Sequence, residues 1–167
     1  MGQGEFALVK EHLTNAIRKP PIGWNPVGDH EIYVSMADIA ATLRDESLLS
    51  TYAAQSDEIS LSLGHTLYHA VTLRALGILD WLHHDYPQAE TRLRESCLLF
   101  QQLGTRWQIG RTLFDLGEMS TELGKMGEAK EYFSQALSAF EVMGARPFVN
   151  KTLEHLDCLN GLNNPSK

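Results

Sequence analysis

The 167 residues carry 14 lysines and arginines against 21 aspartates and glutamates, which gives a formal net charge of −7 at neutral pH. Because binding of nucleic acid needs a basic face for the phosphates, this balance argues against nucleic acid as the main partner. Apolar residues make up 43% of the chain, as in ordinary folded proteins, yet no stretch approaches the roughly 18 uncharged apolar residues that span a membrane.

The two cysteines, Cys97 and Cys158, have neither the spacing of a metal site nor that of a CxxC pair. The first residues lack the long apolar run of a signal peptide. A chain of this length suggests one domain. We therefore predict a single cytoplasmic domain, because unpaired thiols persist in reducing compartments.

The N-terminal residues 4–19 carry an apolar stripe that predicts a helix over residues 5–18. Its residues match the second helix of the repeat described below at Gly4, Phe6, Val9, Leu13 and Ala16. We therefore expect a half-repeat here. Each large apolar side chain left bare forgoes about 1.5–3 kcal/mol, so we expect further repeats, a partner or a second copy of the chain to cover this face.

An irregular connection follows in the segment RKPPIGWNPVGD. Its three prolines and two glycines predict a loop over residues 20–28. Trp24 either pins this loop against the first repeats or lies over the edge of a groove.

The remaining chain shows apolar stripes with the three- and four-residue spacing of helices. We predict these helices over residues 29–44, 46–62, 66–82, 87–102, 106–122, 126–142 and 147–160. Thr66 and Thr105 are the expected N-cap residues of two of them.

A 40-residue repeat organises these helices. Residues that match at this interval include Gly64, Gly104 and Gly144, and also Leu73, Leu113 and Leu153. Because the three glycines follow long helices, we expect each of them in the left-handed conformation that ends a helix. The repeats predicted from this register are a degenerate copy over residues 29–62, clear copies over 63–102 and 103–142, a half-repeat over 143–161 and a tail over 162–167.

The repeat resembles the tetratricopeptide repeat (TPR) family. The matching residues are Leu73, Leu76, Gly77, Ala89 and Leu93 in one copy, and Leu113, Leu116, Gly117, Ala129 and Phe133 in the next. The usual period of that family is about 34 residues, whereas here it is 40. The longer period is similar to the C-terminal repeat arrays of bacterial ATPase-linked transcription activators and of adenylate or guanylate cyclases. The resemblance implies an all-α, right-handed superhelix of antiparallel helix pairs, with about eight helices.

In this family the first helix of each pair lines a concave face. The positions that carry over predict a partner-binding groove of Asp38, Arg74, Ile78, Trp81, Arg111, Phe114, Asp115, Glu118 and Glu122, with Thr42, Lys151, Glu154 and His155 on the same face. Such a mixture of charges and aromatic anchors is typical of surfaces that bind protein or peptide segments. The alternative is a solvated face on which Trp81 only covers a neighbouring repeat.

The histidines and cysteines do not show the spacing of a metal site or of a catalytic site. His65 and His69 are four residues apart and His83 and His84 are adjacent, but a metal site needs three or four converging ligands. Cys97 falls on an apolar stripe and is expected in the core. We therefore expect no catalytic residue, no metal and no cofactor.

These observations predict a non-catalytic interaction module that binds a protein or peptide within a bacterial signalling system. Two alternatives remain open from the sequence. One is a regulatory domain that senses a small molecule, and the other is a module that associates with itself through its half-repeat ends.

Overall fold

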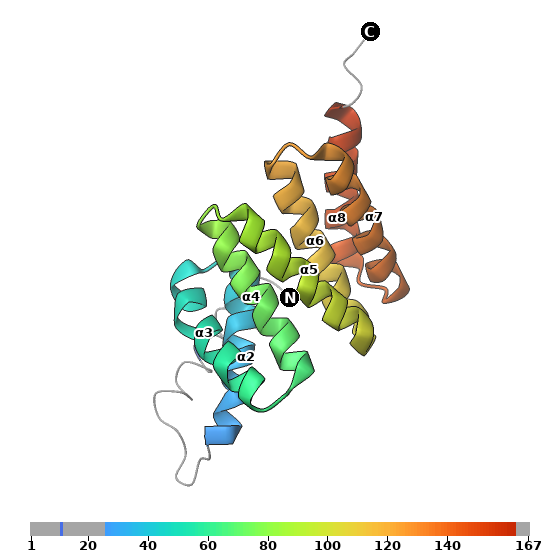
Figure 1. Cartoon of the computed structure of the whole chain (residues 1–167). Coiled ribbons are helices and arrows are strands. Elements are labelled where there is room, and N and C mark those ends of the chain that lie inside the picture. The colour runs from blue at the N-terminus through green and yellow to red at the C-terminus, as the bar shows by residue number, and fades with distance from the viewer. Residues whose placement is uncertain (1–10, 12–25, 163–167) are drawn as a thin grey trace.

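The structure, a computed structural model, describes Glu11 and residues 26–162, with side chains over residues 31–161. The N-terminal half-repeat and Trp24 lie outside the described residues. Residues 26–162 form the helices α2 (Pro26–Leu43), α3 (Glu46–Ser62), α4 (Thr66–Leu82), α5 (Tyr86–Leu103), α6 (Arg106–Glu122), α7 (Met126–Val142) and α8 (Arg146–Leu162) (Figure 1). None of these helices is long and apolar enough to cross a bilayer.

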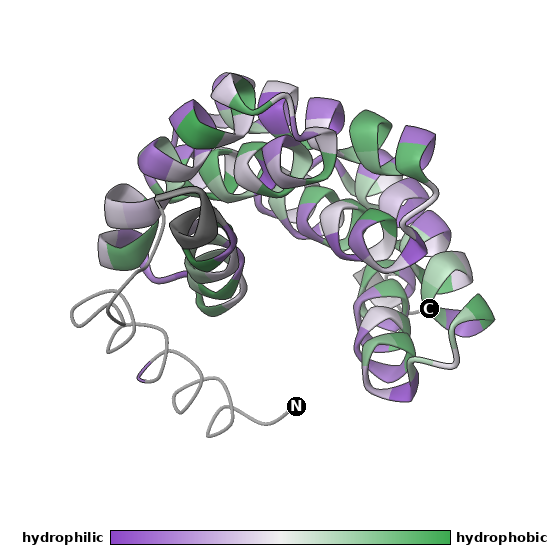
Figure 2. Cartoon of the chain, turned by 90° about the horizontal axis from the view of Figure 1, so that it is seen from below, coloured by the Kyte–Doolittle hydropathy of each residue, from purple (hydrophilic) through white to green (hydrophobic). Residues whose placement is uncertain are grey.

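The helices stack as antiparallel pairs along a curved path. Each helix packs chiefly against the one before and the one after it, and α2 also packs against α4. From below, the stack is an arc with two rows of helices (Figure 2). The predicted all-α superhelix of helix pairs is therefore confirmed.

The turns that connect successive helices are evenly spaced along the sequence, and the spacing is half of the 40-residue repeat. A residue with positive φ follows each of the helices α2 to α7. These residues are Arg44, Gly64, His84, Gly104, Gly124 and Gly144. At the first glycine, the Gly64 amide donates to the Leu61 carbonyl at 3.1 Å and the next amide donates to the Ser60 carbonyl at 3.1 Å. This pair of bonds is the Schellman motif, which satisfies the last carbonyls of a helix. The three glycines predicted to be left-handed are confirmed.

The predicted N-caps are only partly right. His65, rather than Thr66, precedes α4, and its Nδ1 accepts a hydrogen bond from the Tyr68 amide at 3.4 Å. Thr105 is the N-cap residue of α6, but its hydroxyl donates to the Phe100 carbonyl at 3.2 Å and does not cap the helix. The physical reason is the Schellman turn, which makes the residue after the left-handed one the N-cap of the next helix.

The predicted loop over residues 20–28 extends too far, because α2 already begins at Pro26. Proline is favoured at the first position of a helix, where its missing N–H would have no partner in any case. The prolines of this segment therefore do not exclude a helix over its last residues.

The predicted apolar stripes form the core. Fully buried side chains include Leu49 in α3, Leu93 in α5 and Phe133 in α7, which come from the three successive second helices. Leu153 is an exception, because 41% of it is exposed on α8 although its matching residues Leu73 and Leu113 are buried. Among the described helices α8 packs chiefly against α7, so its far side lacks the cover that α4 and α6 have.

Two mid-helix glycines mark close approaches within helix pairs. A Cβ atom at Gly77 would lie 2.9 Å from the Leu93 side chain and 3.2 Å from the Ala89 carbonyl oxygen. At Gly117 it would lie 2.8 Å from the ring of Phe133. The two helices of a pair therefore approach closely at these glycines, and mainly the large side chains of Leu93 and Phe133 fill the space opposite.

Replacing Gly117 with Ala is expected to lower the free energy of unfolding by about 1–3 kcal/mol, because the added methyl group overpacks the core against Phe133. Gly127 is the matched control, since it lies in α7 and a methyl group added there would meet no packed neighbour within 4 Å. Gly127→Ala should leave stability unchanged or raise it by up to about 1 kcal/mol through helix propensity. Urea unfolding measures both, and equal effects would contradict the close approach at Gly117.

Candidate functional site

The first helices of the pairs bring most of the predicted groove residues together. Asp38 comes from α2, Arg74 and Trp81 come from α4, and the others come from α6 at Arg111, Phe114, Asp115, Glu118 and Glu122. Ile78 does not belong to this surface: it is fully buried in a core cluster to which α2, α3, α4, α5 and α6 all contribute. This complete burial corrects its prediction as a groove residue.

Four of these side chains form an ion-pair network, made of Asp38, Arg74, Arg111 and Asp115. Asp38 is partly exposed and the other three are buried, so we call this group the buried ion-pair network. The Nε of Arg74 lies 2.7 Å from Oδ2 of Asp115, and its Nη1 lies 3.0 Å from Oδ1 of Asp38. The Nη1 of Arg111 lies 2.8 Å from Oδ2 of Asp38 and its Nη2 donates to the Thr42 hydroxyl. Arg74 is only 3% exposed and Asp115 only 5%. These charges are therefore already paired inside the protein.

The buried ion-pair network joins helices that are two repeats apart. Repeats of a solenoid ordinarily contact only their neighbours, but Arg111 on α6 reaches Asp38 on α2 across 73 residues of sequence. Arg74 on α4 lies between them and binds a carboxylate from each side. The network thus links α2, α4 and α6 on their shared face.

Charge pairing outweighs burial at Asp38. Burial alone would raise the pKa of this carboxyl group, but the guanidinium groups of Arg111 and Arg74 hold the pKa below its ordinary value. At Arg111 burial outweighs charge pairing. Burial and the neighbouring positive charge of Arg74 lower the pKa of the guanidinium more than Asp38 and Asp115 raise it. Asp38 therefore stays ionised and the network remains a set of charged pairs.

A second group of residues, the open cluster, lies beside this network towards the C-terminal ends of α4 and α6. It consists of Arg44, Trp81, Tyr86, Glu118 and Glu122. The Nη2 of Arg44 lies 3.0 Å from both Asp115 Oδ1 and Glu118 Oε2, and its Cζ lies 4.2 Å from the centre of the Trp81 ring. The Trp81 indole N–H and the Tyr86 hydroxyl each donate to Glu122 at 2.7 Å.

These two hydrogen bonds keep Glu122 charged. The bond from Tyr86 and then that from Trp81 lower the pKa of the Glu122 carboxyl group. The same bond to Glu122 raises the pKa of the Tyr86 hydroxyl. The open cluster therefore presents an indole ring that is bonded to Glu122 through its N–H. Arg44 stacks on this ring and pairs with Glu118.

Two cavities open on this face. One of about 510 Å³ is bordered by Trp81, Glu118, Glu122 and His155, and Arg44 also contributes to its wall. The other, of about 220 Å³, lies over the buried ion-pair network. The larger cavity is within the usual range of about 300–1,000 Å³ for ligand sites, so the open cluster has accessible space in front of it.

Helix α8 forms the far side of the face. Lys151 lies 3.2 Å from Oε1 of Glu118 and 4.3 Å from the centre of the Phe114 ring. The ring of His155 stacks on that of Phe133 with 4.8 Å between centres. Glu154 is exposed. Lys151 and His155 are thus the residues of α8 that the structure brings to the predicted groove.

The stability of the protein is expected to fall as the pH drops through about 6.5, and His155 should cause part of this loss. Burial lowers the pKa of His155 from its ordinary value of 6.5, so below that pH the unfolded chain takes up a proton before the folded protein does. The loss stops once the pH is below the folded pKa.

Urea unfolding of His155→Phe between about pH 7.5 and 5.5 measures this contribution. Phenylalanine preserves a ring on Phe133 but cannot titrate, so the variant should show a flatter dependence of stability on pH. Equal slopes for the variant and the unaltered protein would contradict the prediction. Glu118 and Lys151, which face His155, are present in both and therefore do not affect the comparison.

The histidines considered as metal ligands have other roles. His65 caps α4 and stacks on Tyr68 with 3.7 Å between ring centres. His69 lies 3.1 Å from Asp57, and His83 lies 3.1 Å from Glu46. Over the residues that the structure describes, no three histidines, cysteines or carboxylates are grouped so as to hold a metal ion.

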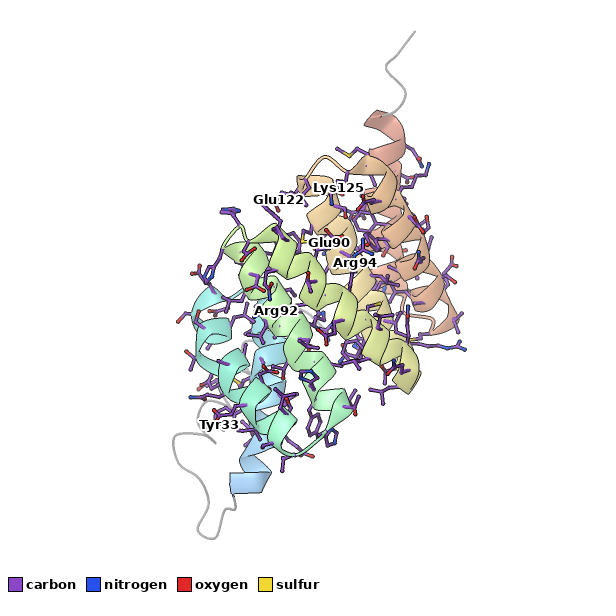
Figure 3. The ribbon with its side chains drawn as sticks, in the orientation of Figure 1. Tyr33, Glu90, Arg92, Arg94, Glu122 and Lys125 are labelled. Carbon is purple, nitrogen blue, oxygen red and sulfur yellow. The ribbon has the colours of Figure 1, made fainter. Side chains whose placement is uncertain are left out.

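The outer face carries a separate group of charged residues (Figure 3). Glu90 on α5 pairs with Arg94 at 2.7 Å and with Lys125 at 3.4 Å. Exposed pairs of this kind contribute at most about 1 kcal/mol each. A cavity of about 370 Å³ lies between α5 and α7, with Cys97 in its wall. Burial raises the pKa of the Cys97 thiol to about 11, so this thiol is protonated and matches the predicted core role.

Sequence patterns missed two members of the open cluster, Arg44 and Tyr86. A signal for Arg44 does exist, because the helices end at a regular interval and Arg44 stands one such interval before Gly64. The 40-residue repeat of glycines marks only the turns at Gly64, Gly104 and Gly144. The turn at Arg44 falls midway between two such positions and is therefore not evident from the repeat. Nothing in the pattern indicates that its side chain reaches α6.

Comparison with known proteins bears on the fold. Neither a scan of protein-family models nor a search of curated proteins gives a match. Similar solved structures include a Rap protein in complex with competence and sporulation factor, with a TM-score of 0.82 and 18% identity over 94% of this chain. Aspartyl phosphate phosphatase F from Bacillus subtilis has a TM-score of 0.73 and 15% identity over 90%. BtubC (BKLC) from P. vanneervenii has a TM-score of 0.61 and 13% identity over 99%.

These likenesses establish a TPR-like helical-repeat fold. The chain spans 44% of the Rap protein, 38% of the phosphatase and 77% of BtubC. It therefore corresponds in length to less than half of the first two proteins. At these sequence identities the similarity is evidence for the fold alone.

Proposed function

We propose that the chain is a non-catalytic module that binds a protein or peptide segment on the concave face. One observation carries this proposal: side chains from the α2–α3 turn, α4, α6 and α8 converge there on a cavity of about 510 Å³ with an indole ring in its wall. Buried aromatic and arginine anchors dominate the binding energy of protein interfaces. The complex of a similar Rap protein with competence and sporulation factor is consistent with this use of the fold.

A signalling role in the cytoplasm is the finer part of the proposal. It is supported by the resemblance of the 40-residue repeats to arrays in bacterial signalling proteins. The two cysteines are unpaired, one buried and one exposed, which fits a reducing compartment.

Affinity capture with matched variants tests the proposed function. Trp81→Ala, Glu122→Gln and Lys151→Ala together alter the concave face at positions that are at least partly exposed. The control changes Glu90→Gln, Arg94→Ala and Lys125→Ala on the outer face. Arg74 and Arg111 are unsuitable, because replacing buried paired charges would disturb the fold.

We expect a bound protein that the concave-face variant loses and the outer-face variant retains, with the interaction then reproduced by calorimetry of the purified pair. Captured proteins that bind both variants equally would overturn the proposed function.

The size of the cavity favours one second candidate, a site for a small regulatory molecule. A compound that raises the melting temperature of the unaltered protein but not of the concave-face variant would support this candidate, because a ligand stabilises the state that it binds. A screen without such a compound, together with a captured protein, would favour the protein-binding function.

A further inference from the structure

We propose that the open cluster is a receptor for an arginine side chain of a basic partner segment, and that Arg44 occupies this receptor in the free protein. This inference rests on the proposed function and specifies the chemistry of the partner. Arg44 would then act as an internal competitor that the partner displaces.

The open cluster has the groups that recognition of a guanidinium requires. Such recognition uses an aromatic face for stacking and carboxylates that accept the planar N–H groups. Trp81 and Glu118 of the open cluster supply the face and one carboxylate oxygen. Asp115 of the neighbouring buried ion-pair network supplies a second one, and each oxygen lies 3.0 Å from Arg44 Nη2. All three residues belong to α4 and α6, so the receptor exists independently of the turn that carries Arg44.

Arg44 fits this receptor imperfectly. Both of its bonds to carboxylates come from Nη2, while Nη1 is buried and lacks a hydrogen-bond partner among the described residues. A guanidinium that is free to rotate could present two nitrogens to the two carboxylates, as in a forked arginine–carboxylate pair. Because Arg44 is fixed in the α2–α3 turn, its guanidinium uses Nη2 for both carboxylates and leaves the N–H groups of Nη1 without an acceptor among the described residues.

The backbone position of Arg44 is one that glycine usually fills. Its φ of 54° is left-handed, at a turn position that is glycine in four of the six turns of the described chain. A residue with a Cβ atom in this conformation costs about 1–3 kcal/mol. The backbone bonds of the turn, from the Arg44 amide to the Ala41 carbonyl and from the Asp45 amide to the Ala40 carbonyl, hold this geometry wherever the guanidinium lies. Glycine at this position would therefore keep the turn and remove the occupant.

Space and charge favour an external arginine. The cavity of about 510 Å³ adjoins Arg44 and is bordered by Trp81 and by the carboxylates of Glu118 and Glu122. It gives an extended segment a route to the indole ring. The net charge of −7 favours a basic partner. Lys151 pairs with Oε1 of Glu118, which leaves Oε2 for the guanidinium.

The test removes Arg44 and supplies arginine from solution. Arg44→Gly places in this turn the residue that most of the other turns have, and Arg44→Asn is a second variant because asparagine tolerates the left-handed conformation. The probe is the peptide Gly-Gly-Arg-Gly-Gly, and its matched control replaces arginine with citrulline, which has the same shape but no charge. The readout is the NMR signal of the Trp81 indole N–H, assigned with Trp81→Phe.

We expect both variants to bind the arginine peptide about tenfold more tightly than the unaltered protein, which is the factor if Arg44 fills the receptor about nine-tenths of the time. Adding Glu118→Gln to either variant should reverse most of this gain, and the citrulline peptide should not shift the signal. Equal affinities with and without Arg44, or equal binding of the two peptides, would overturn the inference.

The inference and the proposed function can fail separately. If the titration shows no gain while capture still depends on the concave face, the arginine receptor is wrong and the proposed function stands. If captured proteins bind the concave-face variant as well as the outer-face variant, the proposed function is wrong whatever the titration shows.

Discussion

Replacement of Asp115 by Asn is expected to lower the free energy of unfolding by about 3–5 kcal/mol, the usual effect of breaking a buried ion pair by removing one partner. Asp115 lies 2.7 Å from Arg74 Nε, and the two side chains are 8% and 4% exposed. The neutral amide would leave the buried charge of Arg74 with Asp38 as its remaining carboxylate. Urea unfolding monitored by circular dichroism measures the loss.

The double variant Asp115→Leu with Arg74→Met is the matched control. It removes both charges together, while Asp38 retains Arg111 and Arg44 retains Glu118. Apolar replacement of a complete buried pair is often neutral or stabilising, so this variant should recover most of the stability that Asp115→Asn loses. A loss below about 1 kcal/mol for Asp115→Asn would show that the pair behaves as an exposed one.

The repeat predicted the fold because its signal is local. The small residues Gly77 and Gly117 and the large ones Leu93 and Phe133 face each other within one helix pair. Their spacing along the sequence therefore reports the packing directly. The left-handed glycines report the turns in the same way, since only backbone geometry within a few residues decides them.

The candidate site was predicted less completely because its contacts are not local. Arg111 meets Asp38 across 73 residues, and Arg44 meets Glu118 across 74. Such pairs depend on the curvature that several repeats produce together, which the helical period does not specify. The sequence could indicate that these residues share a face, but not that Arg74 and Asp115 are buried.

The turn residues also show that a sequence pattern predicts a backbone position but not the contacts of its side chain. Arg44 and His84 occupy left-handed positions. The spacing of the glycines indicates both positions once the turns are taken to recur at half of the 40-residue repeat. The contact of Arg44 with Trp81 could not be derived in this way, because the two residues lie on different helix pairs.

Phe133→Ala is expected to lower the free energy of unfolding by about 3–5 kcal/mol, the usual range for truncating a buried phenylalanine. The Phe133 ring is fully buried and fills the space against Gly117. It also contacts the Phe114 ring at 5.3 Å and the His155 ring at 4.8 Å between centres. Its removal therefore leaves a cavity between α6, α7 and α8 directly behind the concave face, and urea unfolding measures the cost.

The same substitution links the core to the candidate site. Without the Phe133 ring, water can reach His155, so the pKa that burial lowers should rise back towards 6.5. NMR titration of the His155 ring in Phe133→Ala measures this shift at a urea concentration that leaves the protein folded. Ser134→Ala, at the exposed neighbouring position, should change stability by less than about 0.5 kcal/mol. An unchanged pKa of His155 beside a full loss of stability would mean that this ring does not keep water from the concave face.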